Sequence, residues 1–321
     1  MPSNKRIAFC VSEKKLQKLN WQELETVCKN YGFEVFKLNL KESLESQGPF
    51  CVLVHKMTDV IASANLGDIR CGNVIEKVER YISQHPSLIV IDPLANVRKL
   101  IDRCSCYSII HSTNLSTYDV FTPNFCTLRS GDRDSLKQQL KIANVTYPFI
   151  CKPILGHGSK AHEMSLIFNE KSLGDIKTPC VAQSFIQHNA VLFKIFIAGD
   201  KHFYVERPSL KNFQACDNRD TIYFDTSDVS KSDSKSRLCV LDPEDVMMEK
   251  PKPDDKILDV IANTLRKAFG MDLLGADVVI DKSTGKYAII DVNAYPGYDG
   301  FPNFFEALLE CISKKISSDF T

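Results

Sequence analysis

The chain has 321 residues, of which 44% are hydrophobic and 25% are charged, so it is long enough for two or three lobes and is neither disordered nor fibrous. Forty basic residues balance forty acidic residues, which excludes an overall field that would draw the chain to nucleic acid or to an anionic membrane. The apolar run near the N-terminus, Ile7 to Val11, is too short for a signal sequence or a membrane span.

Twelve cysteines are scattered along the chain without a Cys-x-x-Cys pair, so zinc and disulfide chemistry are not expected. Most of them lie in apolar runs, where a free thiol behaves as a small hydrophobic group. We therefore expect a reduced, cytoplasmic protein with no membrane span and no nucleic-acid partner.

The first part of the chain, to about residue 110, alternates strand-like and helix-like patterns. Such alternation predicts an α/β sheet with helical crossovers. The expected strands are 6–11, 33–38, 51–55 and 88–91, with helices at about 20–29 and 71–83. A further helix is expected after Asp92, with Asp92 as its N-cap and Pro93 at the first helical position.

A second lobe is predicted to begin at about residue 112, where Ser, Thr and Asn become frequent. Strands near 149–152, 163–168 and 180–185 indicate a small, largely antiparallel unit, and a hairpin follows over 191–206. The stretch 209–256 is polar, and residues 227–236 are expected to be mobile or ordered by a ligand. Helices are expected at 255–269 and about 304–315. The predicted units are 1–111, 112–190 and 191–321.

Two strand-like segments near the C-terminus, 273–280 and 287–294, each carry an acid within apolar residues. A carboxylate in such a strand must be paired or bound to a metal to offset its desolvation. Asp277, Asp291 and Asn293 supply oxygen atoms only, which suits Mg²⁺ shared with substrate phosphates. The alternative for these segments alone is a pair of strand-end acids in a hairpin turn.

Lys152 ends a predicted strand beside a glycine-rich turn that also carries His157, Lys160 and His162. A fixed cation next to a turn whose backbone N–H groups are accessible is typical of triphosphate binding, although a simple hairpin is the alternative.

Lys194 lies within an apolar strand, where it either reaches the strand edge or meets an anion in a cleft. The polar turn before that strand could present backbone groups to an adenine, and an ordinary loop is the alternative. Lysines also follow the first N-terminal strands, at Lys14, Lys15 and Lys56. Ligands of an open α/β sheet collect at this edge, so these lysines suggest a multiply anionic substrate, with solvated lysines as the alternative.

Several motifs, taken in chain order, carry a resemblance that covers about residues 6–315. They are Ser12-Glu-Lys-Lys-Leu-Gln-Lys-Leu-Asn20, His55-Lys-Met-Thr-Asp-Val60, Phe149-Ile-Cys-Lys152, His162-Glu-Met164, Asn189-Ala-Val-Leu-Phe-Lys194, Arg207-Pro-Ser-Leu-Lys-Asn-Phe213 and Ile290-Asp-Val-Asn-Ala-Tyr-Pro-Gly-Tyr298. The chain resembles the inositol-tetrakisphosphate 1-kinase family, also called the inositol 1,3,4-trisphosphate 5/6-kinase family.

The resemblance implies an α/β, ATP-grasp fold in which an N-terminal lobe on the inositol phosphate side precedes central and C-terminal lobes that enclose ATP. The implied nucleotide contacts are Arg103, Lys152, Gln183, His188, Lys194, Ser209 and Ser230. The implied inositol phosphate contacts are Lys15, Lys56, His162, Lys194, Asn293 and Gly297. Asp277, Asp291 and Asn293 resemble the Mg²⁺ ligands, with Asp291 placed to bridge two ions.

The implied enzyme is a phosphotransferase that uses ATP and Mg²⁺, with His162, Lys194 and Asp291 as the catalytic candidates. Its acceptor would be inositol 1,3,4-trisphosphate at the 5 or 6 hydroxyl, or inositol 3,4,5,6-tetrakisphosphate at the 1 hydroxyl. Transfer between inositol phosphates through bound ADP is a further activity that the resemblance makes possible. A monomer is expected to suffice.

Two alternatives stay open at this point. An ATP-grasp carboxylate–amine ligase would share Lys152, Asp277 and Asp291, but it would need a carboxylate-recognising arginine and an amine site. A sensor that binds without turnover would not need the metal ligands.

Overall fold

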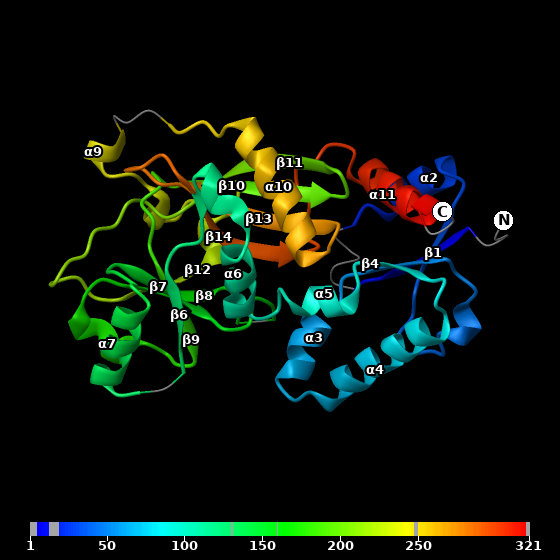
Figure 1. The fold of residues 1–321 in the computed structure, drawn as a ribbon, viewed down its shortest axis with the longest axis horizontal. Helices are drawn as coiled ribbons and strands as arrows, with labels where there is room; N and C mark the ends of the chain where they lie inside the picture. The colour runs from blue at the N-terminus through cyan, green and yellow to red at the C-terminus, as the bar shows by residue number, and fades with distance from the viewer. Residues whose placement is uncertain (1–4, 13–18, 130, 159, 247–249, 319–321) are drawn as a thin grey trace.

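The computed structural model describes residues 5–12, 19–129, 131–158, 160–246 and 250–318. Over these ranges the strands form three sheets, which Figure 1 shows as three neighbouring lobes. The strands are β1 (Arg6–Cys10), β2 (Glu34–Lys37), β3 (Val52–His55), β4 (Ile89–Ile91), β5 (Val120–Phe121), β6 (Phe125–Leu128), β7 (Phe149–Pro153), β8 (Glu163–Ile167), β9 (Cys180–Ser184), β10 (Val191–Ala198), β11 (Lys201–Pro208), β12 (Ile222–Asp225), β13 (Leu273–Ile280) and β14 (Tyr287–Ala294).

The N-terminal sheet has the order β2-β1-β3-β4, and its described strands are all parallel. Parallel neighbours need long crossover connections, and helices supply several of them. The helices of this part are α2 (Trp21–Asn30), α3 (Thr58–Asn65), α4 (Ile69–Gln84) and α5 (Leu94–Arg98), with the short 3₁₀ helix η1 (Glu45–Gln47). The alternating pattern of the sequence predicted this arrangement, and Lys56 follows β3 at the carboxyl edge of the sheet.

The central sheet has the order β12-β8-β7-β9-β6, and its pairs are antiparallel. The expectation of a largely antiparallel unit is therefore confirmed. Its flanking helices are α7 (Arg133–Ile142) and the 3₁₀ helix η3 (Glu170–Asp175).

The C-terminal sheet has the order β11-β10-β13-β14-β5. Helix α10 (Asp255–Phe269) turns a stripe of apolar side chains toward the protein interior, from Leu258 to Phe269, and Gly270 ends it with a positive φ of 64°. The remaining helices of the described ranges are α6 (Arg103–His111), η2 (Asn114–Tyr118), α8 (Thr226–Val229), η4 (Arg237–Cys239), α9 (Pro243–Val246) and α11 (Phe304–Ser318).

Two strands join a sheet on the far side of a predicted lobe boundary. The short β5 pairs in parallel with β14 of the C-terminal sheet, although it lies within residues 112–190. The later β12 pairs with β8 of the central sheet, although it lies within residues 191–321. The chain thus passes between the central and C-terminal sheets more than once, and the boundaries at 111 and 190 stay predictions.

The polar stretch 209–256 is more ordered than its composition suggested. Within it, Ile222 to Asp225 form β12, and Thr226 to Val229 form α8, whose N-cap is Asp225. Residues 227–229 lie in α8, and Val229 is buried, so this segment begins with regular structure. That residues 227–236 are mobile or ordered by a ligand stays a prediction. Sequence composition could not reveal the pairing of β12 with β8, which involves residues about 60 positions away.

The prediction that Asp92 caps a helix is wrong. Helix α5 begins at Leu94, and Pro93 is its N-cap. The buried Asp92 carboxylate instead accepts hydrogen bonds from the backbone N–H groups of Asp272 and Leu273, at 2.7 and 2.9 Å. These bonds join the end of β4 to the start of β13, so the N-terminal sheet is tied to the C-terminal sheet by a side chain.

All twelve cysteines lie in the described ranges and are free thiols. None of the helices in those ranges combines the length and the apolar character needed to cross a membrane.

Replacement of Asp92 by Ala should destabilise the protein, because it leaves two buried backbone N–H groups without an acceptor. Each such group costs about 1–3 kcal/mol, so we expect a loss of at least about 2 kcal/mol in the free energy of unfolding, measured by urea denaturation. Asp132→Ala is the control, since it removes an exposed N-cap carboxylate and should cost about 1 kcal/mol. If the two variants lose equal amounts of unfolding free energy, the hydrogen bonds of Asp92 do not hold the two sheets together.

Candidate active site

A cleft of about 510 Å³ lies where the three sheets meet, a size suited to a nucleotide-sized ligand. It is lined by all but one of the site residues predicted from the sequence. These lining residues are Lys56, Arg103, Lys152, His162, Gln183, His188, Lys194, Ser209, Ser230, Asp277, Asp291, Asn293 and Gly297. The exception, Lys15, lies outside the described residues.

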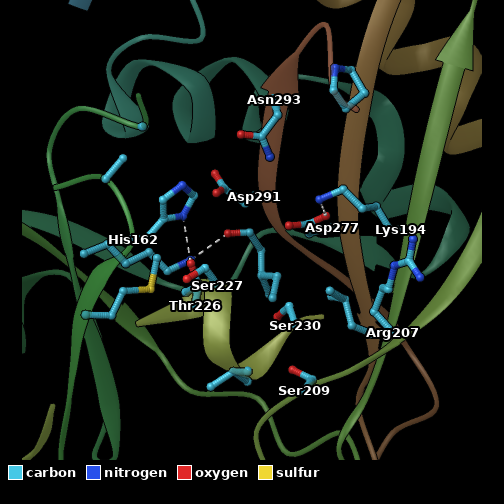
Figure 2. A pocket seen from close by; sticks show the side chains of 18 of the residues that line it. His162, Lys194, Arg207, Ser209, Thr226, Ser227, Ser230, Asp277, Asp291 and Asn293 are labelled. Carbon is cyan, nitrogen blue, oxygen red and sulfur yellow. Dashed lines mark hydrogen bonds and ion pairs between the residues drawn. The ribbon is translucent and has the colours of Figure 1, made fainter. Parts of the chain in front are cut away.

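The predicted acidic residues face each other across two neighbouring strands. Asp277 on β13 is the register partner of Asp291 on the antiparallel β14. Asn293 follows Asp291 by two positions and therefore shares its face of the sheet. Figure 2 shows the three side chains pointing into the same space. The acids lie within the strands and not in the turn that joins them, so the hairpin-turn alternative does not hold.

Cations from two other elements offset the charge of this acid pair. Lys194 on β10 is the register partner of Asp277, and its Nζ lies 3.0 Å from Asp277 Oδ1. Arg103 Nη2 on α6 lies 3.6 Å from Asp291 Oδ2. Burial opposes the charge on Lys194, but the Asp277 and Asp291 carboxylates outweigh it and raise the pKa of Lys194 overall. Lys194 therefore sits within a strand because an anion lies beside it.

The donor atoms of this corner fit a small, hard cation. Two carboxylates and one amide oxygen converge on the cleft, and such oxygen ligands suit Mg²⁺ that is shared with phosphate groups. Nowhere in the described ranges do three His, Cys, Asp or Glu side chains form a group able to hold a metal ion. A cation here would depend on Asn293 and on ligand oxygens as well as on the two acids.

Lys152 on β7 is buried behind the acid pair. Its Nζ donates to the carbonyl of Ile290 at 2.7 Å and to Tyr107 Oη at 3.2 Å. Burial lowers the pKa of Lys152 to about 8, with Asp291 acting against this shift and Arg103 adding to it. A phosphate oxygen within reach would stabilise the charged form of this lysine.

Arg103 holds the glycine-rich loop that follows β7. Its Nη1 donates to the carbonyls of Pro153 and Leu155 at 2.6 and 3.0 Å, and its Nη2 donates to the carbonyl of Ala161 at 3.2 Å. The side chain is buried. In the structure these donors go to the loop, so the contact of Arg103 with nucleotide phosphates stays a prediction.

The other end of the cleft is less charged and contains buried hydrogen-bonding groups. His188 Nε2 lies 2.7 Å from Ser209 Oγ, and its Nδ1 lies 2.5 Å from the carbonyl of Ile186. Burial lowers the pKa of His188 to about 4, although the Ile186 carbonyl opposes the shift. Gln183 is 3% exposed, and its Nε2 has no hydrogen-bond partner among the described residues. This amide is therefore positioned to donate to a ligand.

The residues predicted to contact the inositol phosphate come from several elements of the fold. Lys56 Nζ donates to the carbonyl of Pro296 at 3.2 Å and lies 5.1 Å from the centroid of the Tyr295 ring. Gly297 follows in the same turn, and a Cβ placed on it would lie 3.0 Å from Asp299 Oδ2. His162 precedes β8 and contacts Thr226 Oγ1 through Nδ1 at 3.0 Å.

The structure adds lining residues that the sequence did not assign to the site, among them Arg207, Thr226 and Ser227. Arg207, the first residue of one of the motifs quoted above, lies on β11, where its Nη2 donates to the carbonyl of Asp299 at 3.1 Å. Arg207 is the register partner of Leu192, so extending the predicted hairpin by one residue would have placed it on the face that carries Lys194. Thr226 and Ser227 begin the unpredicted α8 and carried no sequence signal.

The sequence matches two family models that together span most of the chain. Residues 115–314 match the inositol 1,3,4-trisphosphate 5/6-kinase ATP-grasp domain, and residues 6–97 match the pre-ATP-grasp domain of the same family. The chain belongs to the inositol 1,3,4-trisphosphate 5/6-kinase family.

Similar proteins of this kinase family include the inositol-tetrakisphosphate 1-kinase of Danio rerio, which is 41% identical over 96% of this chain and 78% of its own length. The inositol-tetrakisphosphate 1-kinase of Xenopus laevis is 42% identical with the same coverage. A rice relative, inositol-tetrakisphosphate 1-kinase 2 of Oryza sativa subsp. indica, is 28% identical over 93% of this chain and 82% of its own length.

Solved structures with the same fold include the D-cycloserine synthetase DcsG, with a TM-score of 0.64 and 11% identity over 97% of this chain and 99% of that chain. D-alanine–D-alanine ligase from Bacillus anthracis has a TM-score of 0.56 and 11% identity over 99% of this chain and 98% of that chain. These similarities concern the fold alone. Together with the family models, they confirm the predicted ATP-grasp fold.

Replacement of Arg103 by Lys should loosen the loop between β7 and β8. A single ammonium group cannot reach the three carbonyls that the guanidinium holds, and bonds to charged groups contribute about 1.5–3 kcal/mol each. We expect the Gly156 amide to exchange with deuterium about tenfold faster or more, as measured by NMR. Arg98→Lys is the control, because Arg98 makes a half-exposed ion pair with Glu79. Unchanged exchange at Gly156 would contradict this role of Arg103.

Because His188 is buried in its neutral form, we expect the ligand-free protein to lose stability in acid. The pKa of His188 is about 4 in the folded state and close to 6.5 when exposed, so the unfolded chain binds the extra proton between these values. The contribution of neutral His188 to the free energy of unfolding is therefore complete above pH 6.5. It is lost as the pH falls from 6.5 through 4, and the total loss is about 3 kcal/mol. His188→Asn should show a shallower loss of stability over this window in urea titrations. The exposed His111→Asn serves as control, and identical slopes for wild type and His188→Asn would refute the prediction.

Proposed function

We propose that this cleft transfers the γ-phosphoryl group of MgATP to a free hydroxyl group of an inositol tris- or tetrakisphosphate. The observation that carries the proposal is that Asp291 and Asn293 line one cleft together with two groups of residues. Lys152 and Gln183 lie on strands of the central sheet, whereas Lys56 and Gly297 follow β3 and β14. The relatives at 41% and 42% identity are named as inositol-tetrakisphosphate 1-kinases, which supports the same activity.

The nucleotide would occupy the end that contains Lys152, Gln183 and His188. Lys152 would meet the α- and β-phosphate oxygens, because a buried ammonium group gains most from an added anion. The free Nε2 of Gln183 would donate to an acceptor of adenine. Ser209 is fixed by His188, and Ser230 lies at the end of α8 on the same cleft.

The inositol phosphate would occupy the end near Lys56, His162 and Gly297. Lysines there match a multiply anionic ligand better than a carboxylic acid, and Lys15 is proposed as a further contact. Gly297 would let a ligand approach the backbone of the turn after β14, because it has no side chain on this wall of the cleft. The acceptors we propose are inositol 1,3,4-trisphosphate at the 5 or 6 hydroxyl and inositol 3,4,5,6-tetrakisphosphate at the 1 hydroxyl.

Phosphoryl transfer demands alignment and charge neutralisation more than covalent chemistry. Asp277, Asp291 and Asn293 would hold Mg²⁺, which when bound neutralises charge on the β- and γ-phosphates. Lys194 lines the cleft and lies 3.0 Å from Asp277, and it would meet negative charge around the transferred group. His162 would contact the acceptor from the opposite wall. A monomer suffices, because one chain supplies all of these side chains.

The direct test supplies ³²P-labelled ATP and Mg²⁺ with a panel of inositol phosphates and, in separate reactions, with amino acid pairs. We expect label to appear in a more highly phosphorylated inositol, resolved by anion-exchange chromatography. Phosphate released only in the presence of an amino acid pair would instead identify a carboxylate–amine ligase and reject the kinase.

Replacement of Asp291 by Ala should abolish turnover while preserving the fold. Loss of a metal ligand removes several kcal/mol of charge stabilisation in the transition state, so we expect turnover to fall by at least about a hundredfold. Asp281→Ala is the matched control, since Asp281 is an acid of the same β13–β14 hairpin that lies outside the cleft. Wild-type turnover in Asp291→Ala, with an unchanged melting curve, would exclude the metal site.

A further inference from the structure

His162 and Thr226 are joined by two hydrogen bonds at the edge of the cleft. The Nδ1 atom of the His162 imidazole lies 3.0 Å from Thr226 Oγ1, and the backbone N–H of Thr226 donates to the carbonyl of His162 at 3.0 Å. Both residues line the cleft. The backbone hydrogen bond holds the two residues next to each other. The side-chain hydrogen bond therefore forms between groups that are already close.

The strand pairing explains why these residues meet. Strand β12 runs antiparallel to β8, and Asp225 is the register partner of Glu163. His162 and Thr226 are the next residues outward from that pair, where the ladder ends and both chains turn to the cleft. Asp225 also caps α8 by accepting the N–H of Ser227 at 2.7 Å, which holds Thr226 in place from its other side.

The bond to Thr226 occupies one of the two imidazole nitrogens. Nε2 is then the ring nitrogen available to a ligand, and Figure 2 shows His162 pointing into the space that Asp291 and Asn293 also face. The partner of one ring nitrogen sets the orientation and tautomer of a histidine and therefore the chemistry of the other.

We propose that Thr226 is a positioning residue that fixes the imidazole of His162 with Nε2 directed at the acceptor phosphates. This inference rests on the proposed function, because it assigns His162 to the inositol phosphate. Thr226 itself need not touch either substrate. Helix α8 would then have two roles. It places Ser227 and its C-cap Ser230 at the cleft, and its first residue, Thr226, orients His162.

Steady-state kinetics of Thr226→Val and Thr226→Ser test the proposal. Valine keeps the shape of threonine but loses the hydroxyl, so kcat/KM for the inositol phosphate should fall about tenfold while the KM for ATP stays within twofold. Serine keeps the hydroxyl and should retain nearly wild-type kcat/KM. Thr221→Val is the matched control, because it also removes a threonine hydroxyl bond, to Asp175, outside the cleft.

An NMR measurement without substrates separates this proposal from the proposed function. In protein with ¹⁵N-labelled histidine, the His162 signals are identified by their loss in His162→Gln. Thr226→Val should shift the His162 Nδ1 and Nε2 resonances and change the tautomer ratio, whereas Thr226→Ser and Thr221→Val should not. If wild type phosphorylates no inositol phosphate, the proposed function fails and this spectrum still decides the positioning role. Unchanged His162 resonances in Thr226→Val, or equal impairment of Thr226→Ser, would overturn it.

Discussion

Two carboxylates that are largely buried on adjacent strands impose the main physical constraint on this protein. Asp277 and Asp291 are register partners on β13 and β14, and like charges in that arrangement repel each other. Their side chains are only 18% and 17% exposed, so nearby cations offset the cost of burying two charges. Lys194 and Arg103 provide that charge at 3.0 and 3.6 Å, and a bound cation would add to it.

The need for cations connects parts of the fold that are distant in sequence. Lys194 comes from the neighbouring strand β10, whereas Arg103 comes from the start of α6, ahead of the central sheet. The same guanidinium holds three carbonyls of the glycine-rich loop, and buried Lys152 donates to the carbonyl just before Asp291. Arg103 and Lys152 thus hold the loop, α6, β7 and β14 together beside the pair of acids.

A second interaction fixes the position of the N-terminal sheet relative to the Asp277–Asp291 pair. Asp92 accepts two backbone N–H groups at the start of β13, the strand that later carries Asp277. Lys56 extends from the edge of the same N-terminal sheet to the turn that holds Gly297. The proposed acceptor end of the cleft is formed across this contact, so its shape depends on how the two sheets are docked.

Local patterns in the sequence determined a large part of the architecture and most of the proposed site. Alternation of apolar and polar residues predicted the parallel and antiparallel units, because side-chain burial follows the period of each element. Acids and lysines inside apolar strands were informative for a related reason: a charge there needs a partner, and Asp277, Asp291 and Lys194 meet one another. The tertiary structure alone decided the partners of Asp92, the carbonyls held by Arg103, and the strand and helix that bring Thr226 to His162. Those contacts join residues roughly 50 to 180 positions apart, and composition and periodicity report only on near neighbours along the chain.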